Sequence, residues 1–191
     1  ISNSIKSRNK IIKYLFEKNL TLGNKKYTNE DLNVKEKILD LIIDLTIRKK
    51  IRKIFGKNLT AFVSGGAALN QNAAIFFFSM GIKILQGYGQ TEYSPIISIT
   101  PFNHIKLDKV GKPIHFTEIK LSKDKEILVR GQSLMQGYWK DKKSTDKTII
   151  DGWLHTGDLG LIDDENYLKI LGRKNEMIVN SGGENIAPTP I

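Results

Sequence analysis

A glycine-rich hexapeptide at residues 87–92 follows a short apolar run, and this pair of features constrains the fold more than any other. The run extends from Ile82 to Gln86 and is typical of a buried strand. The hexapeptide, Gly-Tyr-Gly-Gln-Thr-Glu, predicts a turn at the end of that strand, because glycine lacks a Cβ and tolerates positive φ. Ligands of open α/β sheets bind at such strand ends. We therefore expect residues 87–92 to line a ligand site.

Three side chains of the hexapeptide suit a nucleotide and its metal ion. Tyr88 offers a flat ring for a base, and Thr91 offers a hydroxyl for a phosphate oxygen. Glu92 offers a hard carboxylate oxygen, the kind of ligand that magnesium prefers. Taken alone, residues 87–92 are equally compatible with a plain connection between a strand and a loop. The nucleotide hypothesis therefore depends on further motifs.

The segment before the hexapeptide predicts a β-α-β unit. Leu59 to Val63 is typical of a strand, and a Gly-Gly pair at 65–66 follows it. Asn70 to Met80 then predicts a helix, which Gly81 ends. Such a unit implies neighbouring parallel strands. We expect the three phenylalanines at 76–78 to bury this helix on the sheet rather than to line a fatty-acyl pocket.

From Val110 onward, short alternating runs predict a small, mainly antiparallel β subdomain. The fold class is therefore α/β, with a parallel-sheet portion followed by this subdomain. The acidic cluster at 163–166 has the composition of paired catalytic carboxylates, but a hairpin turn is the favoured interpretation. The predicted strands are Glu118–Leu121, Glu126–Arg130, Gly160–Asp163 and Tyr167–Leu171.

Two amphipathic helices are predicted in the first 56 residues. The first spans Ile5 to Phe16 and is followed by a loop from Thr21 to Glu30. The second begins at Asn33, which can form a capping pair with Glu36, and runs to about Phe55. Its apolar stripe consists of Val34, Ile38, Leu41, Ile42 and Leu45.

The chain is basic, with a net charge of +10, and residues 1–60 hold 15 Lys and Arg against 6 Asp and Glu. The basic run at 48–53 could contact anionic lipid or nucleic acid, but a solvated helix face is the favoured interpretation. The absence of cysteine excludes disulfides and a cysteine nucleophile and is compatible with the cytosol. The apolar stretch from Ala73 to Ile82 is too short to span a membrane. We expect a cytoplasmic protein, with peripheral membrane contact as a further hypothesis.

Further motifs recur in a fixed order around the hexapeptide. Ser-Gly-Gly-Ala stands at 64–67, Gly-Trp followed by Thr-Gly-Asp at 152–158, Gly172-Arg173 after it, and Gly-Gly-Glu-Asn-Ile-Ala-Pro at 182–188. In this order and spacing the chain resembles the adenylate-forming superfamily, and within it bacterial long-chain fatty-acyl-CoA synthetases. The resemblance covers about Asn33 to Ile191. It implies that the last residues begin a mobile C-terminal domain. It also implies that the chain divides into the helical and α/β part at 1–106, the β subdomain at 107–172, and the hinge with the start of the C-terminal domain at 173–191.

The resemblance also implies roles for individual residues. Tyr88 is expected to stack on adenine, with Thr91 on the α-phosphate and Glu92 as the magnesium ligand. Asp158, in a predicted Thr-Gly-Asp turn, is expected to accept hydrogen bonds from the ribose hydroxyls, with Arg173 beside it, although either residue could instead form a structural ion pair. Gly66, Ala67 and Ala68 are expected to line the other side of adenine, and Gly89 is expected to be a further nucleotide-binding residue. Asn175 occupies the hinge position, where the resembling enzymes usually have Asp or Lys.

The implied activity is that of an AMP-forming ligase. The parent enzyme would make an acyl-adenylate from a long-chain fatty acid and ATP with Mg²⁺, and would then transfer the acyl group to coenzyme A. An aryl or other carboxylic acid is the alternative substrate, and a non-catalytic remnant with a basic membrane-binding surface is the alternative class. No specific nucleic acid is expected as a partner. Because the phosphate-gripping loop and the reactive lysine of the resembling enzymes would lie before Ile1 and after Ile191, we expect a fragment that is inactive alone.

Overall fold

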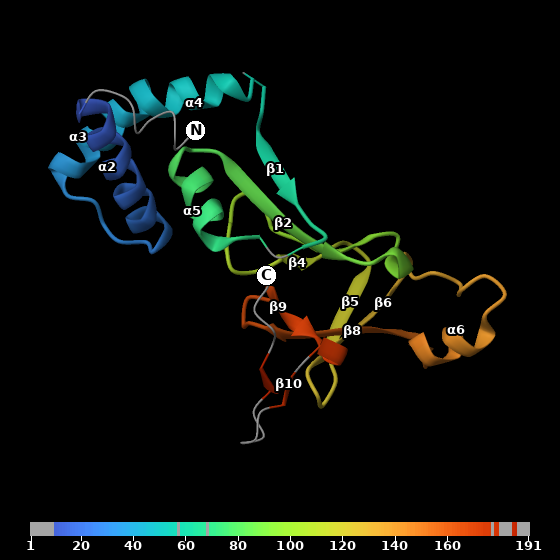
Figure 1. Cartoon of the computed structure of the whole chain (residues 1–191). Coiled ribbons are helices and arrows are strands. Elements are labelled where there is room, and N and C mark those ends of the chain that lie inside the picture. Colours follow the sequence, from blue (N-terminus) through green and yellow to red (C-terminus); the bar gives the residue numbers. More distant parts are fainter. Residues whose placement is uncertain (1–9, 57, 68, 177, 180–184, 187–191) are drawn as a thin grey trace. The chain divides into compact units, whose positions relative to one another are not determined.

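The computed structural model describes residues 10–56, 58–67, 69–176, 178–179 and 185–186. The chain divides into two compact units. Unit 1 comprises Ile1–Phe62 and Leu69–Ile84, and unit 2 comprises Val63–Ala68 and Leu85–Ile191. Figure 1 labels their elements along the chain. No helix in the described part of the chain is long and apolar enough to cross a membrane.

Unit 1 is built mainly from helices. The chain forms α2 (Lys10–Tyr27) and then an unbroken helical segment from residue 34 to residue 54. This segment consists of α3 (Val34–Ile43), the π-helix η1 (Asp44–Arg48) and α4 (Lys49–Ile54). After a gap in sequence comes α5 (Gln71–Ser79). The predicted capping box is confirmed, since the Asn33 side chain accepts from the Glu36 backbone and the Glu36 side chain accepts from the Asn33 backbone.

The loop predicted from Thr21 is wrong, because α2 continues through this region to Tyr27. Leu22 is buried, and Gly23 lies against α5 so closely that a Cβ on it would sit 2.4 Å from the Cβ of Ser79. The helix is therefore maintained by packing against a segment more than 50 residues away, despite its central glycine. The first residues of the predicted helix, Ile5 onward, lie outside the described part.

The core of unit 1 forms where α4, α5 and the ends of two strands meet. Ile51, Met80 and Ile82 are its buried centre. Phe77 of α5 packs against Phe62, with ring centroids 6.0 Å apart in an edge-to-face arrangement. The expectation that the phenylalanines bury α5 on the sheet is confirmed for Phe77, which contacts Phe62 of β1, whereas Phe76 packs against Phe16 of α2.

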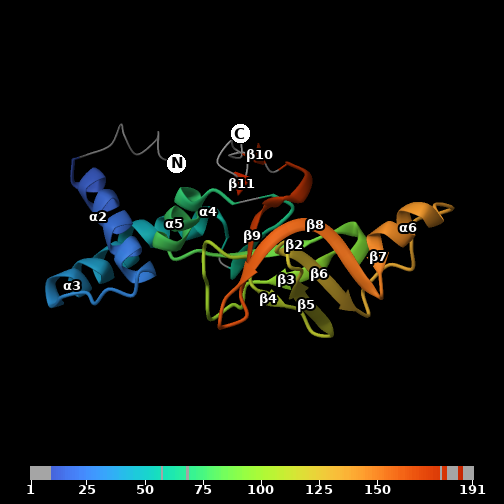
Figure 2. The ribbon, with the colours of Figure 1, turned by 90° about the horizontal axis from the view of Figure 1, so that it is seen from below.

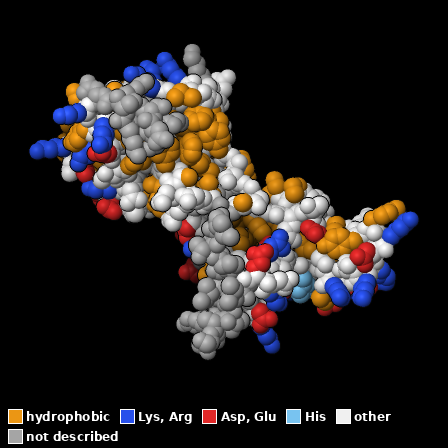
Figure 3. All heavy atoms as spheres, in the orientation of Figure 1, with side chains coloured by type: hydrophobic (Ala, Val, Ile, Leu, Met, Phe, Trp, Pro, Cys, Tyr) orange, Lys and Arg blue, Asp and Glu red, His pale blue; other side chains and the backbone are white. Residues whose placement is uncertain are grey.

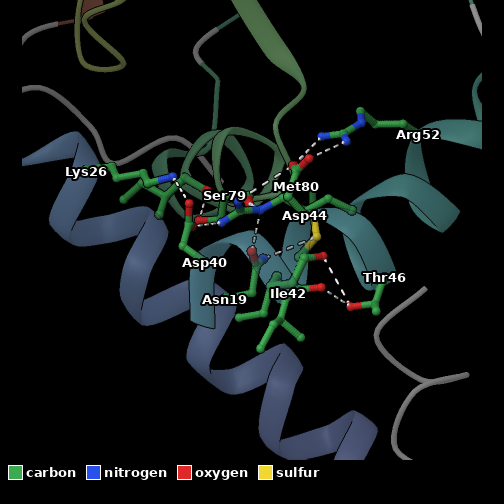
Figure 4. Close-up of polar contacts among 12 residues, drawn as sticks. Asn19, Lys26, Asp40, Ile42, Asp44, Thr46, Arg52, Ser79 and Met80 are labelled. Atoms are coloured by element: carbon green, nitrogen blue, oxygen red, sulfur yellow. Dashed lines mark hydrogen bonds and ion pairs between the residues drawn. The ribbon is translucent and has the colours of Figure 1, made fainter. Parts of the chain in front are cut away.

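The basic run at 48–53 is not a uniform solvated face. Arg48 is only 5% exposed, and its Nε lies 2.8 Å from both Asn19 Oδ1 and the Ser79 carbonyl oxygen. Its Nη2 donates to Asp40 across 2.8 Å, and Arg52 pairs with Asp44 (Figure 4). Arg48 therefore links the helical segment 34–54 to α2 and α5, and Arg52 pairs within that segment, whereas the neighbouring lysines at 49 and 50 are exposed.

The apolar stripe of α3 and η1 lies on the surface of unit 1 rather than in its core. Figure 3 shows hydrophobic side chains among charged ones on the surface of the helical unit. The inward face of the same helical segment carries Ile43, Arg48 and Ile51, all of which are buried. The five stripe residues are between 45% and 74% exposed: Val34, Ile38, Leu41, Ile42 and Leu45.

The strands form two larger sheets, and the predicted α/β class is confirmed. The first sheet has the order β1 (Ala61–Ser64), β2 (Lys83–Gly89), β3 (Ile96–Ile99), β4 (Lys112–Pro113). It is mixed, because β1 and β2 are joined through α5 as a β-α-β crossover whereas the pairs β2–β3 and β3–β4 are antiparallel. The boundary between the two units runs through β1 and β2.

The second sheet belongs to unit 2 and is antiparallel in all its pairs, as predicted. Figure 2 shows its strands side by side, in the order β5-β6-β8-β7 with β9 also paired to β8. The hairpin predicted at 163–166 is confirmed, since Asn166 donates its backbone N–H to the Asp163 carbonyl. The strands are β5 (Thr117–Leu121), β6 (Glu126–Gly131), β7 (Ile149–Ile150), β8 (Trp153–Ile162) and β9 (Leu168–Arg173).

The core of unit 2 includes Tyr93, Ile97, Ile127 and Leu154. Short elements complete the unit: η2 (Thr91–Tyr93), α6 (Lys142–Thr148), η3 (Lys174–Glu176), and the paired strands β10 (Ile178–Val179) and β11 (Asn185–Ile186). Most of the motif at 182–188, and with it most of the expected start of a C-terminal domain, lies outside the described residues.

Candidate nucleotide site

The glycines of the hexapeptide lie inside β2, not in a turn after it. Neither Gly87 nor Gly89 has a positive φ, so the predicted reason for these glycines is wrong. The physical reason is close approach. A Cβ on Gly89 would lie 1.7 Å from the Pro95 carbonyl oxygen, where the register of β2 and β3 shifts between Tyr88 and Gly89. A Cβ on Gly65 would likewise lie 3.3 Å from the Gly87 carbonyl oxygen, which places the Gly-Gly motif beside β2.

The turn predicted for the hexapeptide begins at Thr91 instead, as the 3₁₀ helix η2. Tyr93 anchors it in the core: its side chain is fully buried, and its hydroxyl lies 3.1 Å from both the Thr117 hydroxyl and the Arg130 carbonyl oxygen. This anchoring leaves Thr91 exposed and Glu92 half-buried.

Glu92 is held at two points by the segment that precedes α6. Its carbonyl oxygen accepts the Met135 N–H across 2.9 Å, and its carboxylate accepts the Tyr138 hydroxyl across 2.7 Å. The hydrogen bond to Glu92, together with burial, raises the pKa of Tyr138, so this phenol stays a neutral donor. The contact of the Tyr138 hydroxyl with the candidate metal ligand was not foreseen from the sequence.

Asp158 lies within β8 rather than in a Thr-Gly-Asp turn, which corrects the second local prediction. Gly157, with a φ of 70°, supplies the local distortion of the strand. Asp158 is 5% exposed, and its backbone N–H donates to the Thr156 hydroxyl across 3.1 Å. A buried carboxylate of this kind requires hydrogen-bond donors around both oxygens.

The donors to Asp158 come from three places in the chain. The Tyr88 hydroxyl donates to Oδ2 across 2.6 Å, and Gln90 Nε2 donates to the same oxygen across 2.8 Å. Arg173 Nε lies 3.0 Å from Oδ1. The structure therefore brings together the predicted ribose pair, Asp158 and Arg173, with the hexapeptide.

Tyr88 packs its ring against the core of unit 2. Burial is the main cause, and the hydrogen bond to Asp158 the second, of a strongly raised pKa of its phenol. The phenol therefore remains protonated and acts as a hydrogen-bond donor. The predicted stacking of Tyr88 on a base stays a prediction.

A second carboxylate, Glu126 of β6, was not predicted. It is 6% exposed; one oxygen accepts the Gly157 N–H across 3.1 Å and the other lies 3.0 Å from Lys174 Nζ and 3.7 Å from His155 Nδ1. Burial alone would raise the pKa of Glu126, but hydrogen bonds from Lys174 and Gly157 bring it below its ordinary value. Its one sequence signal was an acidic residue at the start of an apolar strand.

A cavity of about 700 Å³ lies in unit 2. Among the predicted site residues, its lining includes Gly89, Thr91, Glu92, Arg173 and Asn175, whereas Gly66, Ala67, Tyr88 and Asp158 are not part of it. Ala68 lies outside the described residues. In the described part of the chain, no three His, Asp or Glu side chains are grouped to hold a metal ion. The lining residues that sequence reasoning missed are Gln90, Glu126, Tyr138, Lys147, Thr148, His155 and Lys174.

Comparison with known proteins gives a consistent result. The model of the AMP-binding enzyme family matches residues 15–139. Long-chain-fatty-acid–CoA ligase FadD15 of Mycobacterium bovis is 41% identical over 147 residues, which are 77% of this chain and 24% of that protein. 2-Succinylbenzoate–CoA ligase of Listeria innocua is 35% identical over 161 residues, 81% of this chain and 34% of that protein. The chain thus spans about a quarter to a third of the length of these relatives.

Solved structures are similar as well. O-succinylbenzoate coenzyme A synthetase from Bacillus subtilis, in complex with ATP and magnesium ion, has a TM-score of 0.62 and 29% identity, covering 73% of this chain and 33% of that one. An anthranilate CoA ligase in complex with anthranoyl-AMP has a TM-score of 0.61 and 27% identity, covering 67% of this chain and 27% of that one.

Proposed function

The chain belongs to the AMP-binding enzyme family, as its resemblance to adenylate-forming enzymes implied, and on this premise we propose that its residues form part of the nucleotide site of a full-length AMP-forming acid–CoA ligase. In this reaction a carboxylate oxygen of the acid attacks the α-phosphorus of ATP. The bond between the α-phosphorus and the bridging oxygen breaks, and pyrophosphate leaves. The thiol of coenzyme A then attacks the acyl carbon of the adenylate, and AMP leaves. The chain supplies positioning groups for the nucleotide.

The buried, donor-rich environment of Asp158 carries this proposal. A carboxylate that is 5% exposed and held by Tyr88, Gln90 and Arg173 is preorganised as a hydrogen-bond acceptor. Ribose hydroxyls are neutral donors that such an acceptor can bind. Arg173, which is partly exposed beside it, adds a fixed positive charge on the side where phosphate would lie.

Glu92 is the proposed magnesium ligand. Mg²⁺ usually takes one or two protein carboxylates together with water and substrate phosphates, and the Glu92 carboxylate at the cavity fits this preference. A bound Mg²⁺ would neutralise charge that develops on the departing pyrophosphate. Tyr138 holds Glu92 at the cavity, and exposed Thr91 beside it is the proposed contact for the α-phosphate.

The remaining role assignments are proposals for the full-length protein. The backbone near residues 66–68, together with Gly89 and the ring of Tyr88, would form the adenine site. Asn175, exposed in η3, would serve as the hinge. The division into 1–106, 107–172 and 173–191 belongs to the same proposal, as do coenzyme A as cosubstrate and a cytoplasmic location.

We propose a long-chain fatty acid as the substrate, supported by the 41% identity with FadD15. An aryl acid is the second candidate, because the relatives also include 2-succinylbenzoate–CoA ligases and an anthranilate CoA ligase. Peripheral membrane contact through the basic run has weaker support, since Arg48 and Arg52 are engaged in ion pairs within unit 1. The 191 residues alone are not expected to make acyl-CoA.

Exchange of labelled pyrophosphate into ATP by the full-length protein tests this function. We expect exchange that depends on a long-chain fatty acid; exchange with aryl acids alone would favour the second candidate. Asp158→Ala should weaken ATP and AMP binding alike, because ribose is present in both, whereas Glu92→Gln should lower the exchange rate more than ATP affinity. Asp164→Ala, at an exposed hairpin position, is the matched control. Unchanged AMP affinity in Asp158→Ala would refute the ribose assignment.

A further inference from the structure

The two oxygens of the Asp158 carboxylate have different environments. Oδ2 receives two hydrogen bonds from uncharged groups, at 2.6 Å from the Tyr88 hydroxyl and 2.8 Å from Gln90 Nε2. Oδ1 faces the partly exposed Arg173, whose Nε lies 3.0 Å away. Since a carboxylate oxygen has two favourable acceptor positions, Oδ2 is filled by the protein and Oδ1 keeps one position.

Gln90 contributes to this arrangement with both N–H groups of its side-chain amide. Nε2 donates to Asp158 Oδ2 and also, across 2.9 Å, to the Thr156 carbonyl oxygen. Both partners only accept hydrogen bonds, so the amide must present its NH₂ group to them. The backbone of Gln90 is extended between β2 and η2, with φ −141° and ψ 155°. One side chain therefore links this end of β2 to two points of β8.

The two residues that donate to Oδ2, Tyr88 and Gln90, lie two positions apart in the chain. Tyr88 is anchored by its ring in the core of unit 2, and Gln90 lies at the cavity. Together they restrict rotation of the Asp158 carboxylate about its Cβ–Cγ bond. Removal of either one would leave the carboxylate buried with one donor fewer on Oδ2.

We propose that Gln90 is a positioning residue of the nucleotide site, which with Tyr88 fixes Oδ2 of Asp158 so that Oδ1 is the oxygen that accepts a ribose hydroxyl. This inference rests on the proposed ribose role of Asp158 and deepens it. Gln90 itself does not contact the ribose in this arrangement. Its contribution therefore appears only with ligands that carry ribose hydroxyls.

The test compares AMP with 2′,3′-dideoxy-AMP as ligands of the full-length protein, by isothermal titration calorimetry. Gln90→Met keeps the length of the side chain and removes its donors. We expect AMP to bind about tenfold more weakly to this variant, as for loss of one charge-assisted hydrogen bond, and dideoxy-AMP to change less than about twofold. Gln132→Met, an exposed position of the same unit, is the matched control and should leave both affinities unchanged.

A second variant keeps the inference testable if Gln90→Met does not fold. Tyr88→Phe retains the ring in the core and removes the other donor to Oδ2, so it should give the same selective loss of AMP affinity. An equal loss for AMP and dideoxy-AMP in the folded variants, or no loss for either, would overturn the positioning role. If wild-type protein binds AMP and dideoxy-AMP equally well, the ribose role itself fails, and the inference fails with it.

Discussion

Replacement of the buried Arg48 provides a quantitative test of how unit 1 is held together. Arg48→Met fills a similar space but removes the donors to Asn19, Asp40 and the Ser79 carbonyl oxygen. Each buried acceptor that loses its donor costs about 1–3 kcal/mol. Asp40 keeps its ion pair with Lys26, so its share is at the low end of that range.

The expected loss in the free energy of unfolding is about 3 kcal/mol, because apolar burial of the methionine offsets part of the sum. Urea unfolding followed by circular dichroism at 222 nm measures it, since α2, α3, α4 and α5 all lie in unit 1. Lys50→Met removes the same charge from an exposed position of α4 and should change the free energy by less than about 0.5 kcal/mol. If the two variants are equally stable, the network does not hold the helices together.

Two further predictions concern unit 2. Gly89→Ala should disrupt the junction of β2 and β3, because its Cβ would collide with the Pro95 carbonyl oxygen; wild-type AMP affinity and stability in this variant would contradict the close-approach argument. Glu126 has a lowered pKa, so its contribution to stability is complete above about pH 4.5 and is lost as the pH falls through the lower folded-state pKa. Denaturant unfolding followed by tryptophan fluorescence should therefore show a decline in stability from pH 5 to pH 2 that Glu126→Gln reduces, and an identical decline in both proteins would exclude this role.

Features set by neighbours in sequence were predictable. The Asn33–Glu36 capping box and the hairpin at 163–166 depend on residues three or four positions apart, and both are found as expected. The predicted loop after Thr21 failed because the continuation of α2 depends on packing of Gly23 against Ser79, which no local pattern reports.

The candidate site shows the same division between local and distant information. Motif order correctly marked the segments that carry Tyr88, Asp158 and Arg173, but the local conformations expected for two of these motifs were wrong. Gln90 donates hydrogen bonds to Thr156 and Asp158, which follow it in the chain by 66 and 68 positions. These two contacts could therefore not be derived from motif spacing. The close approach of Gly89 to Pro95 was missed because glycine was interpreted as a conformational residue rather than a small one.

The division of the chain into two units has a consequence for dissection of the protein by proteolysis or by truncated genes. Unit 1 is discontinuous: its second stretch, Leu69–Ile84, follows six residues of unit 2. No single cut therefore separates the units. A product that ends at Phe62 would keep α2, α3, η1 and α4 but lack α5, together with the core residues Met80 and Ile82. During synthesis, the guanidinium of Arg48 cannot obtain its acceptor on Ser79 until 31 further residues have been added.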